Sequence, residues 1–202
     1  MKILQTPVRL FSPGGVESYV ANLSTQLSML GHEVKVICAD TPGQRVLGDK
    51  VEVKPLWSAG KIANTNITPS LPWALFGEKF DLIHAHMPTP WSADWSAAAS
   101  RFRRKPLVLT YHSDIVGRGT ASYLARAYNR SGLKFVLDSA DKILVARSSH
   151  LSSCLEDHKD KVSVVPIGVD EKAFVPFSAP QRCDVFFLSV LDEFHGFKGL
   201  EV

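Results

Sequence analysis

Short apolar runs alternate with longer amphipathic stretches along most of the chain. Apolar residues recur with a helical period from Val16 to Leu30, and this pattern stops at Gly31, a residue type that commonly ends helices. Strands that alternate with helices in this way predict a mostly parallel, Rossmann-like doubly wound α/β sheet covered on both faces. The predicted strands are residues 3–4, 32–38, 51–56, 80–86, 107–112, 142–146 and 162–166, the predicted helices are 16–30, 71–76, 91–102, 121–139 and 148–155, and residues 57–68 are predicted loop.

The stretch 13–17, Pro-Gly-Gly-Val-Glu, connects the first predicted strand to the first helix. Gly14 and Gly15 carry no Cβ and lie beside the unsatisfied N–H groups and positive dipole end of that helix, so a phosphate or sugar hydroxyl can approach closely. A tight turn that requires positive φ explains the glycines equally well. Glu17 fits either a ligand contact or an ordinary acidic residue in a helix first turn.

Three histidines fall at the ends of predicted strands, where open parallel sheets bind their ligands. His112 ends one strand, and His84 and His86 end another. We expect His84 and His86 to face opposite sides of the sheet, so that only His86 reaches the ligand crevice. A strand-end histidine taken alone is more often a structural residue with satisfied hydrogen bonds.

The pattern changes after residue 167, where prolines and weak periodicity are typical of a linker. We expect one domain over residues 1–167, a linker over 168–183, and the truncated start of a second domain over 184–202. The apolar strand predicted at 184–191 has no sheet of its own in this sequence. It is therefore expected to pair with a sheet edge or with a neighbouring copy, which predicts homo-oligomer formation.

Composition narrows the functional classes. The 202 residues are 45% hydrophobic and 21% charged, and the net charge of +3 is too small to indicate a nucleic-acid-binding protein. The absence of a long apolar run predicts a cytoplasmic protein, and the three widely spaced cysteines favour neither a disulfide framework nor a zinc site. We expect no metal cofactor.

Six segments in order resemble the first domain of GT-B glycosyltransferases of the large retaining family 4, which includes enzymes similar to sucrose synthase and to phosphatidylinositol mannosyltransferase. No one segment is decisive, but their order and spacing carry the resemblance over nearly the whole chain. The segments are Pro13-Gly14-Gly15-Val16-Glu17, Leu30-Gly31-His32-Glu33-Val34, Phe80-Asp81-Leu82-Ile83-His84-Ala85-His86, Thr110-Tyr111-His112-Ser113-Asp114, the run 140–148 and the run 164–170.

The resemblance implies transfer of a sugar, with retention, from a nucleoside-diphosphate donor such as a UDP- or GDP-sugar to an acceptor hydroxyl. It places Gly14 and Gly15 at the donor diphosphate and sugar, and His112 beside the transferred sugar as the catalytic residue. Lys198 would bind the donor diphosphate, while Ser189-Val190-Leu191 replaces the Gly-Arg-Leu usual in the family. The resemblance implies an acceptor that is a sugar, a lipid-linked sugar or a cell-envelope glycan, and it assigns Glu17, His86, Ser113 and Asp114 to the acceptor side of the crevice.

Other interpretations fit part of the sequence. A nicotinamide dehydrogenase is suggested by Asp40, which follows the second strand at a suitable distance, but the chain has no GxGxxG. A non-catalytic fragment that keeps only acceptor-side contacts is the alternative from another class, and we expect residues 1–202 alone to be inactive. The basic segment 101–105 suggests peripheral contact with the inner face of a membrane, although a solvated helix end explains it more simply.

Overall fold

The structure is a computed structural model, and it describes residues 1–12, 14–43, 47–62, 65–115, 121–148 and 153–169. The chain divides into two units, Met1–Ile167 and Gly168–Val202. Nearly all described residues belong to the first unit. The predicted strand at 184–191, its expected pairing and Lys198 lie outside the described residues, so these remain predictions.

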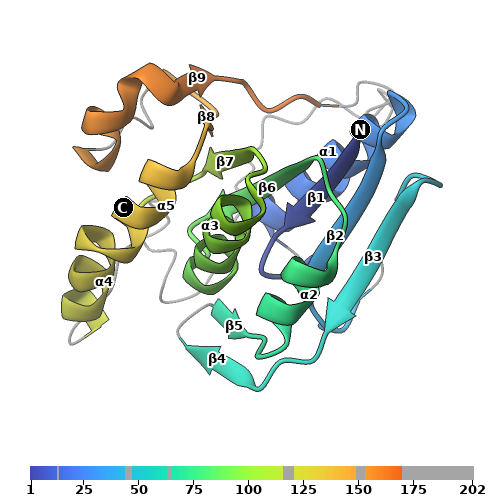
Figure 1. Cartoon of the computed structure of the whole chain (residues 1–202), viewed down its shortest axis with the longest axis horizontal. Helices are drawn as coiled ribbons and strands as arrows, with labels where there is room; N and C mark the ends of the chain where they lie inside the picture. Colours follow the sequence, from blue (N-terminus) through green and yellow to red (C-terminus); the bar gives the residue numbers. More distant parts are fainter. Residues whose placement is uncertain (13, 44–46, 63–64, 116–120, 149–152, 170–202) are drawn as a thin grey trace, which may run out of the picture. The chain divides into compact units, whose positions relative to one another are not determined.

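Seven parallel strands form one sheet in the order β3-β2-β1-β6-β7-β8-β9 (Figure 1). Every neighbouring pair is parallel, which confirms the predicted sheet. The strands are β1 (Lys2–Thr6), β2 (Glu33–Ala39), β3 (Val51–Leu56), β6 (Leu82–Met87), β7 (Leu107–Tyr111), β8 (Lys142–Val145) and β9 (Val162–Val164). The helical segments are α1 (Gly15–Met29), α2 (Leu71–Gly77), α3 (Pro90–Arg103), α4 (Ala121–Arg130), α5 (Gly132–Ser139) and the 3-10 segment η2 (Ser153–Lys161).

The direction of chain progression across the sheet reverses at β1. The chain moves from β1 to β2 and β3 on one side, and then returns to place β6 on the other side of β1. Such a reversal separates the loops that leave the carboxyl ends of the two central strands, which is where doubly wound sheets bind ligands. The loop after β1, the α1 N-terminus and the end of β6 therefore meet at one edge.

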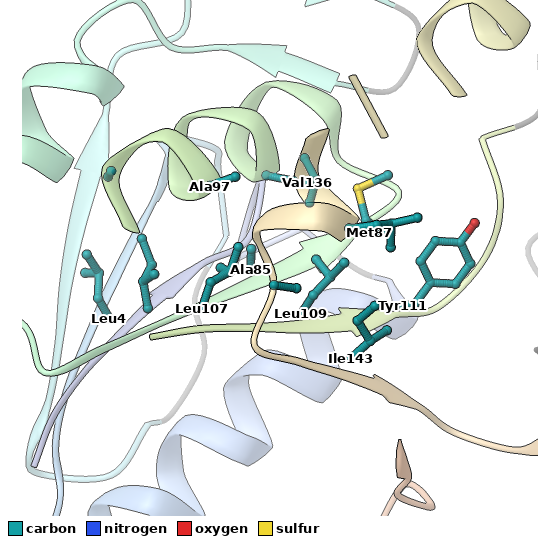
Figure 2. Close-up of a cluster of buried hydrophobic side chains, with 14 of the residues drawn as sticks. Leu4, Ala85, Met87, Ala97, Leu107, Leu109, Tyr111, Val136 and Ile143 are labelled. Carbon is teal, nitrogen blue, oxygen red and sulfur yellow. The ribbon is translucent and has the colours of Figure 1, made fainter. Parts of the chain in front are cut away.

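Helices cover the two faces of the sheet differently. Helix α1 lies on one face, and α3 and α5 lie on the other (Figure 2). The α3 face contains the larger apolar core, in which Leu4, Ala85 and Leu109 from neighbouring strands pack against Ala97 of α3 and Val136 of α5. Small residues along α3 allow the helix backbone to lie close to the sheet.

Two aspartates fix the opposite, amino-terminal edge of the sheet. Asp81, just before β6, accepts from the backbone N–H of Lys2 at 2.8 Å, and its own N–H donates to the carbonyl of Lys2 at 2.8 Å. Asp141, just before β8, makes the same pair with Leu107 at 2.8 and 2.9 Å. Each aspartate thus ties the start of its strand to the first residues of the neighbouring strand.

Two secondary-structure predictions were wrong. The predicted loop 57–68 contains a two-stranded antiparallel hairpin, β4 (Gly60–Ile62) and β5 (Thr65–Ile67). The predicted helix 121–139 is two helices, because Ser131 leaves helical geometry at φ −122° and ψ −68°. A Cβ on the following Gly132 would lie 2.5 Å from the Tyr128 ring, so the tight packing at the break requires glycine. Of the predicted helix 148–155, residues 149–152 are outside the described part and 153–155 belong to η2.

Candidate functional site

The glycine turn opens α1 without needing an unusual backbone. Gly14 is the N-cap with φ 169°, an extended value available to any residue, and Gly15 is the first helical residue. Neither is among the glycines with positive φ, so the alternative that explained the pair by positive φ was wrong. A Cβ on Gly14 would lie 2.1 Å from Glu17 Oε2, whereas a Cβ on Gly15 would meet no atom within 4 Å. A side chain at Gly14 would therefore displace the Glu17 carboxylate, while Gly15 leaves open space beside the first helix N–H groups.

Glu17 lies beneath the turn instead of pointing into open space. It is 7% exposed and accepts from Arg9 Nε at 3.2 Å. Arg9 also donates through Nη1 to Asn66 Oδ1 of β5 at 3.4 Å, and Asn66 donates to Ser58 at 3.1 Å. The carboxylate assigned to the acceptor side therefore binds Arg9, which connects α1 to the β4–β5 hairpin.

The two histidines of β6 share one face of the sheet. Their rings stack with centroids 4.6 Å apart, so the prediction that they face opposite sides was wrong. Successive side chains alternate along a strand, and residues two apart, such as His84 and His86, return to the same side. Both are buried, His84 at 5% and His86 at 0% exposure, on the face covered by α1. His86 therefore does not present a free imidazole to solvent at the strand end.

A buried polar network surrounds these rings. Gln5 of β1 contacts both histidines, with Nε2 3.4 Å from His84 Nδ1 and Oε1 2.8 Å from His86 Nε2. On β7, the Thr110 hydroxyl lies 2.8 Å from His84 Nε2 and 3.5 Å from the Tyr19 hydroxyl of α1. These contacts join three strands and α1 across the sheet face behind the crevice.

Burial keeps both rings neutral. Desolvation, followed by repulsion from a charged His112, lowers the pKa of His84 to about 3. Burial lowers the pKa of His86 well below its ordinary value, and repulsion from His84 and His112 acts in the same direction. Near pH 7 both imidazoles are therefore hydrogen-bonding groups without charge.

His112 comes directly after β7 and is half-buried. Its backbone N–H donates to the carbonyl of Met87 at 3.1 Å, which holds it at the end of β6. The Tyr19 ring packs edge-on against His112 at 5.0 Å and against His86 at 5.9 Å, and the two imidazoles lie 5.9 Å apart at 23°. Because Tyr19 is one helical turn after Gly15, it brings the glycine turn and His112 to the same edge.

The other predicted site residues separate into groups. Ser113 and Asp114 are exposed after His112, and Asp114 accepts from the Tyr111 hydroxyl. Within the described ranges no three His, Cys, Asp or Glu side chains are grouped so that they could bind a metal ion. Sequence reasoning missed the network residues Gln5, Arg9, Tyr19, Asn66 and Thr110. A polar Gln5 inside an apolar strand was a signal available for one of them.

The chain matches a known protein family over most of its length. The sequence model of Glycosyltransferase Family 4 matches residues 13–173, from the glycine turn past the last described strand. Phosphatidyl-myo-inositol mannosyltransferase of Mycolicibacterium smegmatis is 29% identical over 150 residues, which cover 60% of this chain and 38% of the relative. The chain therefore spans well under half the length of that curated relative.

Solved glycosyltransferase structures have the same fold at low identity. Anabaena HepE in complex with UDP has a TM-score of 0.61 and 16% identity, over 85% of this chain and 45% of HepE. Sucrose-phosphate synthase of Thermosynechococcus elongatus has a TM-score of 0.58 and 17% identity, over 87% of this chain and 50% of the synthase. These structures establish the likeness of fold, and the family match, which covers most of the chain and includes both the glycine turn and His112, shows that the chain belongs to Glycosyltransferase Family 4.

Proposed function

We propose that residues 1–167 form the acceptor-side domain of a retaining glycosyltransferase that uses a nucleoside-diphosphate sugar such as a UDP- or GDP-sugar. The observation that carries the proposal is the open space at Gly15, at the N-terminus of α1 and one turn from the ring that packs on His112. The match to a mannosyltransferase and the nucleotide complexes of proteins with this fold support the same donor class.

The α1 N-terminus and His112 have separate roles in the proposed reaction. The departing diphosphate gains negative charge, and the α1 N-terminus supplies N–H groups and a positive dipole end toward it. His112 hydrogen-bonds the transferred sugar, since a neutral imidazole can donate or accept near pH 7. Lys198 lies outside the described residues and is assigned to the diphosphate by the family resemblance alone, and the exposed Ser113 and Asp114 are proposed to face the acceptor.

The acceptor approaches from the carboxyl edge of the sheet. Among the described residues no helix is long and apolar enough to cross a bilayer. The exposed Phe102 and its basic neighbours lie at the C-terminal end of α3, near the amino ends of the strands and away from the glycine turn. A membrane bound there would lie at the edge opposite His112, so we propose that a sugar acceptor, lipid-linked or free, reaches the site without that segment.

A titration of the 202-residue chain with UDP-glucose and GDP-mannose, followed by amide and imidazole NMR, tests the donor proposal. Shifts confined to the residues around Gly15 and His112 are expected, and Gly15→Val should abolish them because its side chain fills the open space. Ser113→Ala is the matched control and should retain the donor-induced shifts. Equal shifts in wild type and Gly15→Val, or none at millimolar donor, would contradict the proposal.

Turnover separates an enzyme from a non-catalytic binding fragment. We expect no transfer by residues 1–202 alone, because the match spans only 38% of the mannosyltransferase relative and the nucleotide half of the donor is proposed to bind mainly outside these residues. In an active form of the protein, His112→Ala should lower kcat by about 10²-fold with little change in melting temperature. A variant with normal kcat and a depressed melting temperature would show that His112 is structural.

A further inference from the structure

We propose that Gln5 is a positioning residue, which fixes the tautomers of His84 and His86 through one side-chain amide and thereby orients His112 at the crevice. The role for His112 rests on the proposed function, whereas the tautomers can be measured without any substrate. Gln5 is fully buried in the middle of the sheet. No part of it needs to touch a ligand for this role.

The distances define one consistent set of proton positions. The amide oxygen of Gln5 faces His86 Nε2 at 2.8 Å, so that nitrogen carries the proton and donates. The amide nitrogen faces His84 Nδ1 at 3.4 Å, so that nitrogen is bare and accepts. His84 Nε2 then carries its proton and donates to the Thr110 hydroxyl at 2.8 Å. Both rings are therefore Nε2–H tautomers.

The reversed amide is disfavoured by the surroundings of His86. With the amide turned over, His86 Nε2 would become an acceptor and its proton would move to Nδ1. His86 Nδ1 is buried and has no hydrogen-bond partner among the described residues. An unpaired buried N–H donor is rarer in proteins than an unpaired acceptor, so the observed orientation leaves the less costly atom unpaired.

The orientation of the His86 ring affects His112 through packing. The His86 ring lies nearly parallel to the His112 ring, and Tyr19 packs edge-on against both. Tyr19 is itself held at the other end of the network, with its hydroxyl 3.5 Å from Thr110. Rotation of the His86 ring would therefore disturb both contacts of His112. Gln5, two positions along the network from His112, controls whether that rotation occurs.

Neutral partners suit this position. The rings facing His112 from β6 carry no charge near pH 7, so they orient the imidazole without attracting or repelling the developing charge of a substrate. A glutamate in place of Gln5 would introduce a negative charge beside the two histidines while keeping nearly the same side-chain shape. Gln5→Glu is therefore the informative substitution.

Long-range nitrogen–proton NMR of the labelled histidine rings in the full 202-residue chain tests the proposal. In the wild-type protein His84 and His86 should each show a protonated Nε2 and a bare Nδ1. Gln5→Glu replaces the amide donor with a second acceptor, so His84 should move its proton to Nδ1, and the Thr110 hydroxyl should reverse and donate. The His112 ring signals should shift in the same variant.

Gln26→Glu on the exposed surface of α1 is the matched control for the added charge, and it should leave all three rings unchanged. Gln5→Leu removes both bonds and should give mixed tautomers with shifted His112 signals. Gln5→Asn serves as a further variant if the leucine protein does not fold. A wild-type Nδ1–H on either β6 histidine, or His112 signals unmoved by every folded Gln5 variant, would overturn the proposal. Loss of donor binding alone would count against the proposed function and leave this result intact.

Discussion

At β1, β6 and β7 the two faces of the sheet are built from the same strands but differ in chemistry. Toward α3, β7 presents Leu109, which is fully buried in the apolar core (Figure 2). Toward α1, the next residue, Thr110, joins the network of Gln5, His84 and His86. An α/β sheet of this size can be stabilised by apolar burial on both faces. The polar face therefore indicates a requirement other than stability, and it lies directly behind the crevice.

The comparison also separates two kinds of energy. The α3 face gains from apolar area removed from water, which does not depend on pH. The α1 face has its own apolar cluster at β2, but at β1, β6 and β7 it depends on hydrogen bonds made by groups that must stay uncharged to remain buried. The predictions below begin with the largest effect.

Leu109→Ala should lower the free energy of unfolding by about 2–5 kcal/mol, because it removes buried methyl groups and leaves a cavity. The loss should be the same at pH 7 and pH 5, as measured by urea unfolding. Met29→Ala, at an exposed position on α1, is the control and should change stability little. A pH-dependent loss for Leu109→Ala would show that the two faces are coupled.

Acid should destabilise the polar face specifically. The pKa of His84 is lowered to about 3 in the folded protein from an ordinary value near 6.5, so its contribution is complete above about pH 6.5 and is lost as the pH falls. Between pH 6.5 and 5 the loss of unfolding free energy from His84 alone should be about 2 kcal/mol. The lowered pKa of His86 adds to this loss in the same window, and urea unfolding at each pH measures the total. The pKa of Glu78 is also lowered, so its ion pairs weaken only at more acidic pH.

His84→Asn should reduce the slope of stability against pH in that window, because it removes one group that titrates in the unfolded chain. His32→Asn, at a half-exposed histidine after α1, provides the comparison. If the slope survives unchanged in His84→Asn, the buried imidazole is not its source.

Thr110→Val tests one hydrogen bond with little change in volume. The substitution leaves His84 Nε2–H without its acceptor, at a cost of about 1–3 kcal/mol. Melting temperature measures the loss, and Thr110→Ser should restore most of it because serine keeps the hydroxyl. Equal stability of the valine and serine variants would remove Thr110 from the network.

The two glycines should respond differently to alanine. Gly15→Ala places a methyl in open space at the helix start and should raise stability by up to about 1 kcal/mol while weakening donor binding. Gly14→Ala should lower stability, because its Cβ would displace the Glu17 carboxylate from beside Arg9. Thermal unfolding of both variants checks the pair, and a stabilised Gly14→Ala would contradict the close packing.

The sequence predicted the parallel α/β sheet because alternation of strands and helices constrains such a fold strongly. It did not predict the hairpin, because β4 is three exposed residues and short polar strands resemble loop. The break at Ser131 was hidden by an apolar period that continues across it, although Gly132 was a signal for the break. Local pattern therefore identified long elements and missed short or interrupted ones.

The candidate site was predicted less completely. The positions of Gly15 and His112 near one edge followed from the rule that ligands bind beyond strand ends. The prediction that His84 and His86 face opposite sides of the sheet was wrong, although side chains two residues apart on a strand share one face. Partners such as Gln5 with His86 are 81 residues apart, and no local pattern reports such a pair. These contacts follow from strand order, which the sequence predicts only in outline.

The hydrogen bonds of Asp81 and Asp141 at the amino-terminal edge of the sheet have a practical consequence for protein engineering. Asp81 and Asp141 fix strand alignment from the amino edge, independently of any loop at the carboxyl edge. We therefore expect strand register to survive exchange of the loops that follow β6 and β7 for those of other proteins of this fold. A library of such grafts would vary the molecules that the protein recognises while the same scaffold is retained.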